Sequence, residues 1–299
     1  MNILVSVIII TYNSSKTILQ TLESIKNQTY NNIELIISDD CSKDNTISLC
    51  EDWIEKNKKR FIVTRIIESN NNTGIPANCN RALKEANGIW IKYIAGDDLL
   101  HFNAIENFIL HYKGEEKIVA GYYQRFYNEE GKINLIGKLE PTTELRDMFN
   151  GDAQEQLSNI KYINFVPAPT VFIKRDIFSI IGNWDEKYKL MEDYPYWVKA
   201  LKAGLRIGFF DELITYYRIS SNSVTSHNSS RYYNINYYLC EFNFKKNNIY
   251  PLISYKEYKY WYNEFISRIR YIILTKIFKN KASRLSNIIF YFLMKISLK

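Results

Sequence analysis

Apolar residues recur in short runs along the N-terminal third of the chain, at Ile3–Ile10, Ile33–Ile37, Phe61–Ile67 and Ile89–Ala95. The first run is continuous and rich in β-branched residues, which is typical of a strand covered on both faces. Between the runs the apolar residues keep helical spacing, at Ile18, Leu19, Leu22 and Ile25 and then at Ile47, Cys50, Trp53 and Ile54. Strands that alternate with helices predict βαβ units and a Rossmann-like, mostly parallel α/β sheet flanked by helices.

Helix-start signals agree with this alternation. Ser14 or Ser15 is placed to cap the first helix, and a second helix is expected from about Thr46 to Lys58. A third is expected to begin near Pro76, because proline is well tolerated in the first turn of a helix.

The pattern changes beyond residue 115. Strands are expected near Ile118–Tyr123 and Val171–Ile173, followed by a helix around Tyr194–Ala203, and the chain from about Arg231 onward has helical patterning. We therefore expect an α/β domain at residues 1–228 and a helical C-terminal region at residues 229–299.

The net charge of +7 is unevenly distributed. Residues 256–299 contain ten Lys or Arg and two Glu, so the rest of the chain is close to neutral. Within residues 261–279 polar and apolar side chains fall on different sides of the expected helix, which is basic and amphipathic. An anionic membrane surface is the favoured partner, and nucleic acid is not expected because no nucleic-acid-binding motif accompanies the charge. The alternative is a helical hairpin that packs on the α/β domain.

Several classes of protein are disfavoured by what the chain lacks. Four cysteines without a CxxC pair argue against a zinc site or a disulfide framework, and they predict a reducing compartment. The apolar N-terminus lacks the flanking features of a signal peptide, and the run Ile288–Met294 is too short to cross a bilayer. The first strand ends in TYNSS rather than GxGxxG, and no P-loop motif occurs, so a nucleotide would have to be bound by side chains.

Three polar clusters follow predicted strands: Thr11-Tyr12-Asn13, Asp39-Asp40 and Asp97-Asp98. Ligands of open parallel sheets bind at the carboxyl ends of the strands, where these clusters are expected to meet. Adjacent carboxylates after a buried run cost on the order of several kcal/mol per charge when they have no partner. A divalent cation that bridges phosphate oxygens would offset that cost.

Taken together, VSVIIITYN, ELIISDDCSKDNT, NNTG, AGDDLL, GNWDE and MEDYPYW resemble the family 2 glycosyltransferases of the GT-A fold, of the type that builds bacterial polysaccharides and O-antigens. The resemblance covers about residues 3–225, in the family's order and approximate spacing. It implies a nucleotide-sugar donor and a divalent metal, Mn²⁺ or Mg²⁺, at the ends of the strands.

On the donor side, the resemblance assigns the nucleotide to Thr11, Asn13, Asp39, Asp40 and Asp97 and the metal to Asp98. Where many members carry a further Asp, this chain has Ala95, so the metal motif is a reduced one. The structural alternatives are a strand end with a turn for the first four residues, and a cap on a helix near Phe102–Leu110 for Asp98.

On the acceptor side, the resemblance makes Asp193 the catalytic base and places Trp184, Asp185 and Glu192 at the acceptor. Arg218 would reach the donor phosphates. The alternatives are acids of a helix first turn for Glu192 and Asp193, a packed Trp with a turn Asp, and an arginine that pairs with a carboxylate.

Two segments depart from the family pattern. Cys79 and Asn80 stand where an Arg-Asn pair is common, with Arg81 one place later, which puts a phosphate contact by this arginine in doubt. Ser220 and Ser221 replace a His-Gly pair, and His227, close by, is expected to be a solvated loop residue.

The predicted function is an inverting, metal-dependent transfer of a sugar from a nucleotide diphosphate, with UDP-hexose as the expected donor. A glycan or polyprenyl-linked acceptor of surface polysaccharide synthesis is expected, with the protein cytoplasmic and peripheral at the inner face of the cell membrane. The alternatives are a non-catalytic, membrane-associated nucleotide-binding module and a glycoside hydrolase that uses a carboxylate pair.

Overall fold

The structure is a computed structural model that describes residues 3–129, 132–219 and 231–297. It divides into two compact units, Met1–Arg218 and Ile219–Lys299. The boundary expected after residue 228 falls in a stretch outside the described residues, so its position stays a prediction. Over the part of the chain that is described, no helix combines the length and apolar character needed to span a bilayer.

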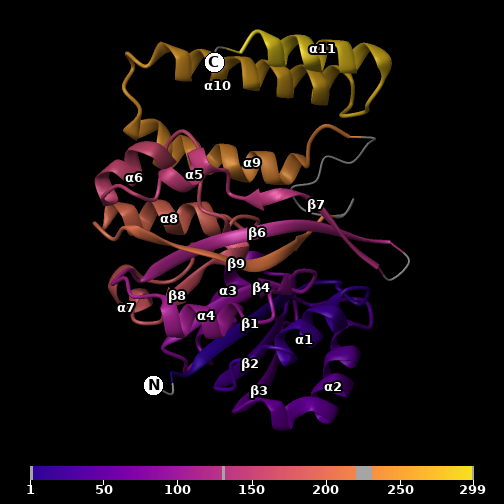
Figure 1. Cartoon of the computed structure of the whole chain (residues 1–299). Helices are drawn as coiled ribbons and strands as arrows, with labels where there is room; N and C mark the ends of the chain where they lie inside the picture. Colours follow the sequence, from indigo (N-terminus) through magenta and orange to yellow (C-terminus); the bar gives the residue numbers. More distant parts are fainter. Residues whose placement is uncertain (1–2, 130–131, 220–230, 298–299) are drawn as a thin grey trace. The chain divides into compact units, whose positions relative to one another are not determined.

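The first unit is built on a nine-stranded sheet with the order β3-β2-β1-β4-β8-β6-β9-β5, and β7 pairs with β6 (Figure 1). Its first half consists of β1 (Val5–Thr11), β2 (Ile33–Asp39), β3 (Val63–Glu68) and β4 (Trp90–Ala95). These four strands are parallel, with β1 between β2 and β4. The intervening helices are α1 (Ile18–Lys26), α2 (Thr46–Asn57) and α3 (Ile75–Leu83). The predicted βαβ units are confirmed.

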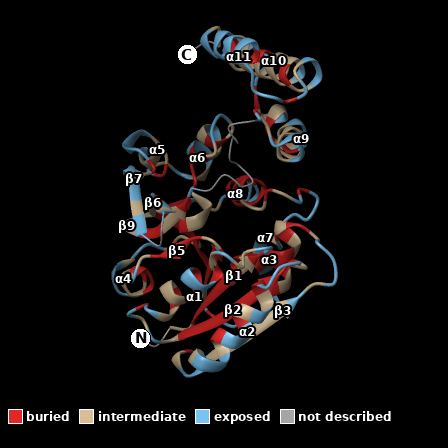
Figure 2. Ribbon diagram, turned by 90° about the vertical axis from the view of Figure 1, so that its right-hand side faces the viewer, coloured by how far each residue is buried: buried red, intermediate tan, exposed pale blue. Residues whose placement is uncertain are grey.

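Both faces of these strands are covered, as the continuous apolar run predicts. Val5, Val7 and Ile9 belong to a core that also contains residues of α1, α2 and α4. The alternate residue Ile8 is also buried, on the face toward which α3 packs against β1 and β2. Figure 2 shows the buried strands surrounded by helices that are exposed on their outer sides. This close-packed core fixes the positions of the carboxyl ends of β1 to β4, which lie at the same edge of the sheet.

The second half of the sheet is mixed. It contains β5 (Leu99–Leu100), β6 (Ile118–Glu129), β7 (Lys132–Glu140), β8 (Phe172–Lys174) and β9 (Ile207–Arg218). The pair β6–β9 is parallel, while β8 is antiparallel to both β4 and β6. The helices of this half are α4 (Ala104–His111), α5 (Thr143–Asp147), α6 (Ala153–Ile160), α7 (Ile177–Ile181) and α8 (Asp193–Lys202).

The predicted serine cap of α1 is wrong, and the helix cap that was the structural alternative for Asp98 is not formed either. Thr17 precedes α1, and Ser14 contributes its carbonyl oxygen, which accepts hydrogen bonds from the amides of Thr17 and Ile18 at 2.9 Å each. The helix expected near Phe102 begins at Ala104 after Asn103, so Asp98 does not cap it. In both cases the chain makes an extra turn before the helix, which local sequence signals do not encode.

The second unit contains α9 (Ile235–Phe244), α10 (Tyr258–Ile272) and α11 (Arg284–Lys295). The helices α10 and α11 contact each other, and the Arg270 guanidinium lies 5.5 Å from the centre of the Phe290 ring. Apolar side chains stay exposed on both helices, including Tyr258, Phe265 and Ile272 on α10 and Leu285, Ile288 and Phe292 on α11. The expected helical character of this region is confirmed.

Candidate active site

The three polar clusters meet at one edge of the sheet. Thr11 pairs in register with Asp39, and the Asp40 amide donates to the Thr11 carbonyl at 3.0 Å. The Gly96 amide donates to the Ile10 carbonyl at 3.0 Å, which brings the Asp97-Asp98 turn to the same edge. A Cβ at Gly96 would lie 2.9 Å from the Thr11 hydroxyl, so this approach requires glycine. The ends of β1, β2 and β4 therefore form a single polar site.

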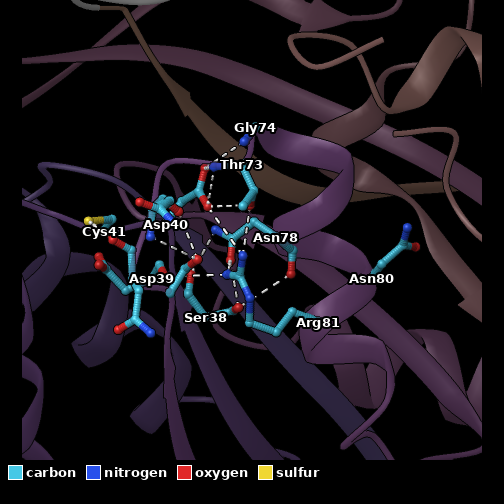
Figure 3. A network of polar contacts seen from close by, with 12 residues as sticks. Ser38, Asp39, Asp40, Cys41, Thr73, Gly74, Asn78, Asn80 and Arg81 are labelled. Carbon is cyan, nitrogen blue, oxygen red and sulfur yellow. Dashed lines mark hydrogen bonds and ion pairs between the residues drawn. The ribbon is translucent and has the colours of Figure 1, made fainter. Parts of the chain in front are cut away.

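The Asp40 carboxylate is the most extensively bonded group of this edge (Figure 3). It accepts hydrogen bonds from the Thr73 amide at 3.0 Å, the Thr73 hydroxyl at 2.6 Å and the Gly74 amide at 2.8 Å. The Arg81 guanidinium completes the set with an ion pair of 3.3 Å. Asp40 thus anchors the NNTG loop at the entry to α3.

Asp39 and Asn13 shape the neighbouring turn. The Asp39 carboxylate accepts hydrogen bonds from the amide and the hydroxyl of Ser42. Asn13 adopts a left-handed conformation, with φ of 52°, and its side-chain oxygen accepts a 2.7 Å hydrogen bond from the Lys43 amide. Thr11 differs from both, because its buried hydroxyl has no hydrogen-bond partner within the part of the chain that the structure describes. An unpaired buried hydroxyl at a ligand-binding edge is a candidate ligand contact.

Arg81, whose role the sequence left in doubt, is part of the Asp40 network (Figure 3). Its Nη1 donates to the Asn78 side-chain oxygen at 2.8 Å, and its Nη2 donates to the Thr73 hydroxyl at 2.7 Å. Asn78 in turn accepts from the Ser38 hydroxyl at 2.6 Å. The one-place shift therefore turns this arginine toward the end of β2.

Asp97 and Asp98 lie in a different environment. Asp98 is 2% exposed, and its Oδ1 accepts a 2.8 Å hydrogen bond from the Arg218 amide. Burial and the neighbouring charge of Asp97 raise the pKa of Asp98 well above its ordinary value. Burial also raises the pKa of Asp97, while the Arg218 guanidinium opposes that shift. Burial and the mutual repulsion of the two acids thus outweigh the nearby charges of Lys92 and Arg218, and the pKa of Asp98 stays raised.

Arg218, the last residue of β9, fastens this turn. Its Nε donates to the Asp97 carbonyl at 2.6 Å and its Nη2 to the Gln20 side chain at 2.7 Å. The guanidinium also lies 4.5 Å from the centre of the Phe126 ring. These contacts hold the Arg218 guanidinium against a backbone carbonyl and a glutamine side chain, and its positive charge lies beside the acid pair.

Glu192 and Asp193 lie at the start of α8. Burial and the charge of Asp193 raise the pKa of Glu192 to about 8. The Asn164 side chain donates a 3.0 Å hydrogen bond to Oδ2 of Asp193. Nearby, the Ile75 amide donates to the Lys189 carbonyl at 2.8 Å, which ties the start of α3 to the segment before Glu192. The acid pair of α8 is therefore connected to the NNTG loop.

Trp184 and Asp185 form a packed turn. Trp184 is 5% exposed, and its ring lies 4.4 Å from the centre of Tyr196 and 5.4 Å from that of Tyr93. The exposed Asp185 accepts a 3.0 Å hydrogen bond from the Lys187 amide. This geometry favours packing over sugar stacking for Trp184, and it leaves Asp185 accessible to an acceptor.

Ser220, Ser221 and His227 lie outside the described residues. Among the described residues, no group of three or more His, Cys, Asp or Glu side chains is arranged to hold a metal ion. A metal at Asp98 would therefore depend on ligand phosphates and water for its remaining positions. Asn164 was not singled out from the sequence, where it is one asparagine among many and carries no motif.

The arrangement is a GT-A fold in which the polar site lies at the ends of β1, β2 and β4. Residues 6–178 match the family described as "Glycosyl transferase family 2". The chain is 31% identical over 223 residues to the Escherichia coli "UDP-Glc:alpha-D-GlcNAc-diphosphoundecaprenol beta-1,3-glucosyltransferase WfaP", an alignment that covers 75% of this chain and 80% of the relative. It is 28% identical over 229 residues to an uncharacterized glycosyltransferase of Haemophilus influenzae, covering 75% of this chain and 68% of that protein. The chain belongs to glycosyl transferase family 2, and it is a transferase.

Solved structures show the same fold. S. aureus TarS 1-349 in complex with UDP-GlcNAc aligns with a TM-score of 0.56 at 20% identity, covering 92% of this chain and 85% of that chain. Against the longer TarS structure the chain spans 51% of the length, again with a TM-score of 0.56. The mannosyltransferase PcManGT from Pyrobaculum calidifontis, in complex with GDP-Man and Mn²⁺, aligns with a TM-score of 0.50 at 17% identity, covering 75% of this chain and 58% of that one.

Proposed function

We propose that this protein is an inverting, metal-dependent glycosyltransferase that moves a hexose from a UDP-sugar to a lipid-linked glycan acceptor in bacterial surface polysaccharide synthesis. The observation that carries the proposal is the buried Asp97-Asp98 pair at the edge where β1, β2 and β4 end. The names of the relatives support the choice of donor and acceptor, since WfaP is named for UDP-Glc and a diphosphoundecaprenol-linked sugar. The TarS complex supports a UDP-sugar as the ligand of such a fold.

The residues at this edge fit a hard divalent cation. Mg²⁺ and Mn²⁺ prefer oxygen ligands, and the acid pair supplies carboxylate oxygens whose pKa values stay raised despite the nearby Arg218 charge. Asp98 would hold the metal with Asp97 beside it, and diphosphate oxygens would provide further ligands. A bound divalent metal would neutralise the negative charge of the departing nucleoside diphosphate.

The nucleoside would lie against β1 and β2. The Thr11 hydroxyl is the clearest candidate contact, because it is buried and unpaired. Asp39 and Asn13 border the same turn, where a carboxylate already bonded to Ser42 retains lone pairs for a ribose hydroxyl or a base N–H. Asp40 and Arg81 would act by holding the NNTG loop against this surface.

Asp193 is the proposed catalytic base. It would take the proton from an acceptor hydroxyl while that oxygen attacks the anomeric carbon of the donor and the bond to the nucleoside diphosphate breaks. Attack from the face opposite the leaving group inverts the anomeric centre in one displacement. The pKa of Glu192, raised to about 8, favours its protonated form, which would donate a hydrogen bond to the acceptor. Asp185 would also contact the acceptor.

The donor site is tested by calorimetric titration of UDP with Mn²⁺ and then with EDTA, on the wild type, Asp98→Ala and the control Asp52→Ala, an exposed acid of α2. We expect metal-dependent binding that only Asp98→Ala abolishes. Asp193→Asn should bind UDP normally and lose about 100- to 10,000-fold in turnover. Absence of metal-dependent binding for UDP, dTDP and GDP alike would contradict the proposal. Binding with turnover that Asp193→Asn leaves intact would contradict the base.

We also propose that the second unit associates peripherally with an anionic membrane. Phe265 on α10 is 59% exposed and Phe292 on α11 is 60% exposed, and each lies in a row of apolar side chains at helical spacing. Exposed basic residues accompany them, including Lys276, Lys279, Lys281, Arg284 and Lys295. Apolar insertion combined with attraction to anionic lipid is the mode of interfacial helices.

Sedimentation with vesicles measures this association. Phosphatidylglycerol vesicles should bind the protein more tightly than phosphatidylcholine vesicles. Phe265→Ser combined with Phe292→Ser should weaken binding by about tenfold or more, since each buried apolar side chain contributes roughly 1.5–3 kcal/mol. Ile62→Ser, an exposed apolar position of the first unit, is the control. Equal binding to both lipids would contradict the proposal.

A further inference from the structure

Asn164 lies in the stretch between α6 and the short 3₁₀ helix Ala168–Thr170, and this stretch passes the start of α8. Two contacts hold it there. The buried Tyr194 hydroxyl of α8 donates to the Ile160 carbonyl at 2.7 Å, and Phe165, next to Asn164, packs edge-on against Phe149 at 4.8 Å. The position of Asn164 is thus determined by the core on both sides.

The two ends of the Asn164 amide differ in their contacts. Its Nδ2 donates a 3.0 Å hydrogen bond to Oδ2 of Asp193, and its Oδ1 is buried without a hydrogen-bond partner among the described residues. An ionised carboxylate only accepts hydrogen bonds, so the NH₂ end must face Asp193 and the oxygen must point away. A buried amide oxygen without a partner is uncommon and costly, and it points to a donor that arrives with a ligand.

We infer that Asn164 is the positioning residue of the Asp193 base and that its unpaired oxygen receives a hydroxyl of the sugar acceptor. The inference rests on the proposed function of this site. A neutral amide is suited to the task because it orients the carboxylate and favours its ionised form without forming an ion pair that would hold the charge in place. The same side chain would bring an acceptor hydroxyl next to the base.

The neighbouring acid Glu192 explains why the neutral Asn164 amide is a suitable hydrogen-bond partner for Asp193. Glu192 is adjacent to Asp193, and burial together with the charge of Asp193 raises the pKa of Glu192, which favours a proton on Glu192. Two carboxylates held in different protonation states can take different roles. The Asn164 hydrogen bond is made to Asp193, which marks that acid as the one held in place for proton removal.

Three substitutions separate positioning from packing. In a UDP-release assay with UDP-glucose and UDP-N-acetylglucosamine and a polyprenyl-diphosphate-linked sugar, Asn164→Ala should lower kcat about 10- to 100-fold, and Asn164→Asp should lower it further. The aspartate introduced by Asn164→Asp has nearly the volume of asparagine, but it places a second negative charge beside Asp193. A packing role predicts the reverse order, since Asp fills the space that Ala leaves empty. Asn183→Asp, an exposed asparagine before Trp184, is the control.

UDP affinity, measured by calorimetry, should stay within about twofold in all variants, and the acceptor KM should rise in Asn164→Ala. Activity of Asn164→Asp equal to or above that of Asn164→Ala would overturn the inference. If the wild type shows no turnover, the proposed function fails, and a double-mutant cycle then tests the contact between Asn164 and Asp193 by itself.

The unfolding equilibrium is measured for Asn164→Ala, Asp193→Asn and the variant that carries both changes. If the two side chains are coupled, the unfolding constant of the double variant should differ by about threefold or more from the value expected when the single effects add. Additive effects would overturn the inference.

Discussion

Two Asp-Asp pairs follow strands of the same sheet, and the fold treats them in opposite ways. Asp40 is enclosed by backbone amides, a hydroxyl and the Arg81 guanidinium. Asp98 is equally buried but is paired through one backbone amide and lies beside a second acid, so its pKa is raised. The hydrogen bonds of Asp40 stabilise the loop that it contacts, whereas Asp98 has fewer partners and is the proposed metal ligand.

The comparison changes the meaning of the two motifs. The resemblance assigns both pairs to ligand binding, yet the hydrogen bonds give Asp40 a structural task that exists without any ligand. Gly74 shows how tightly this loop is built, because it adopts φ of 94° and a Cβ there would lie 2.6 Å from the Lys189 carbonyl oxygen. The loop therefore connects the donor edge to the segment that leads into the acid pair of α8.

The largest effect is expected for Asp40→Ala. Removing this carboxylate leaves two backbone amides and a guanidinium without their partner, which should lower the free energy of unfolding by about 3 kcal/mol. Chemical denaturation followed by circular dichroism measures it. Asp52→Ala, on the exposed face of α2, should change stability by less than about 0.5 kcal/mol. A near-neutral Asp40→Ala would show that the network adds little to the fold.

In contrast to Asp40→Ala, the substitution Asp98→Asn should raise the free energy of unfolding when divalent metal is chelated. A carboxyl whose pKa is raised in the folded state stabilises the protein most below its ordinary value of 3.8, and that contribution is lost as the pH rises through the raised pKa. In EDTA, the wild type should therefore lose stability relative to Asp98→Asn as the pH rises from about 4 to 8. Melting curves over that range measure the difference. If the melting temperatures of the wild type and Asp98→Asn change with pH in the same way, the proposed difference between the Asp39-Asp40 and Asp97-Asp98 pairs is contradicted.

The smallest effect is expected for Thr11→Val. Replacing a buried hydroxyl that has no partner by a methyl group should raise the free energy of unfolding by about 1 kcal/mol, because an unsatisfied polar group is removed. The same change should weaken UDP binding by roughly fivefold, the equivalent of one lost hydrogen bond of about 1 kcal/mol. Thermal melts and calorimetry test the two effects separately. A destabilised variant would indicate that the hydroxyl has a partner within the protein.

Much of the fold followed from local pattern. The apolar runs and helical spacings place β1 to β4 and α1 to α3 within a few residues of their observed bounds. The rule that ligands bind at the carboxyl ends of parallel strands brings Thr11, Asp39 and Asp97 to one edge before any coordinates are known. The helices and strands depend on residues close in the chain, and the position of the polar clusters depends on the general rule that parallel strands end at the same edge of the sheet.

The hydrogen-bond partners of the carboxylates were decided only by the tertiary structure. Asp98 accepts from Arg218, and Asp193 accepts from Asn164, across long stretches of intervening chain. No periodicity encodes which of two identical acid pairs will be saturated by amides and which will stay short of positive charge. The sequence by itself determined the elements and their chemistry, because apolar spacing and turn residues act locally. Packing of distant segments determined the environment of each carboxylate, because burial and hydrogen bonding are properties of the assembled core.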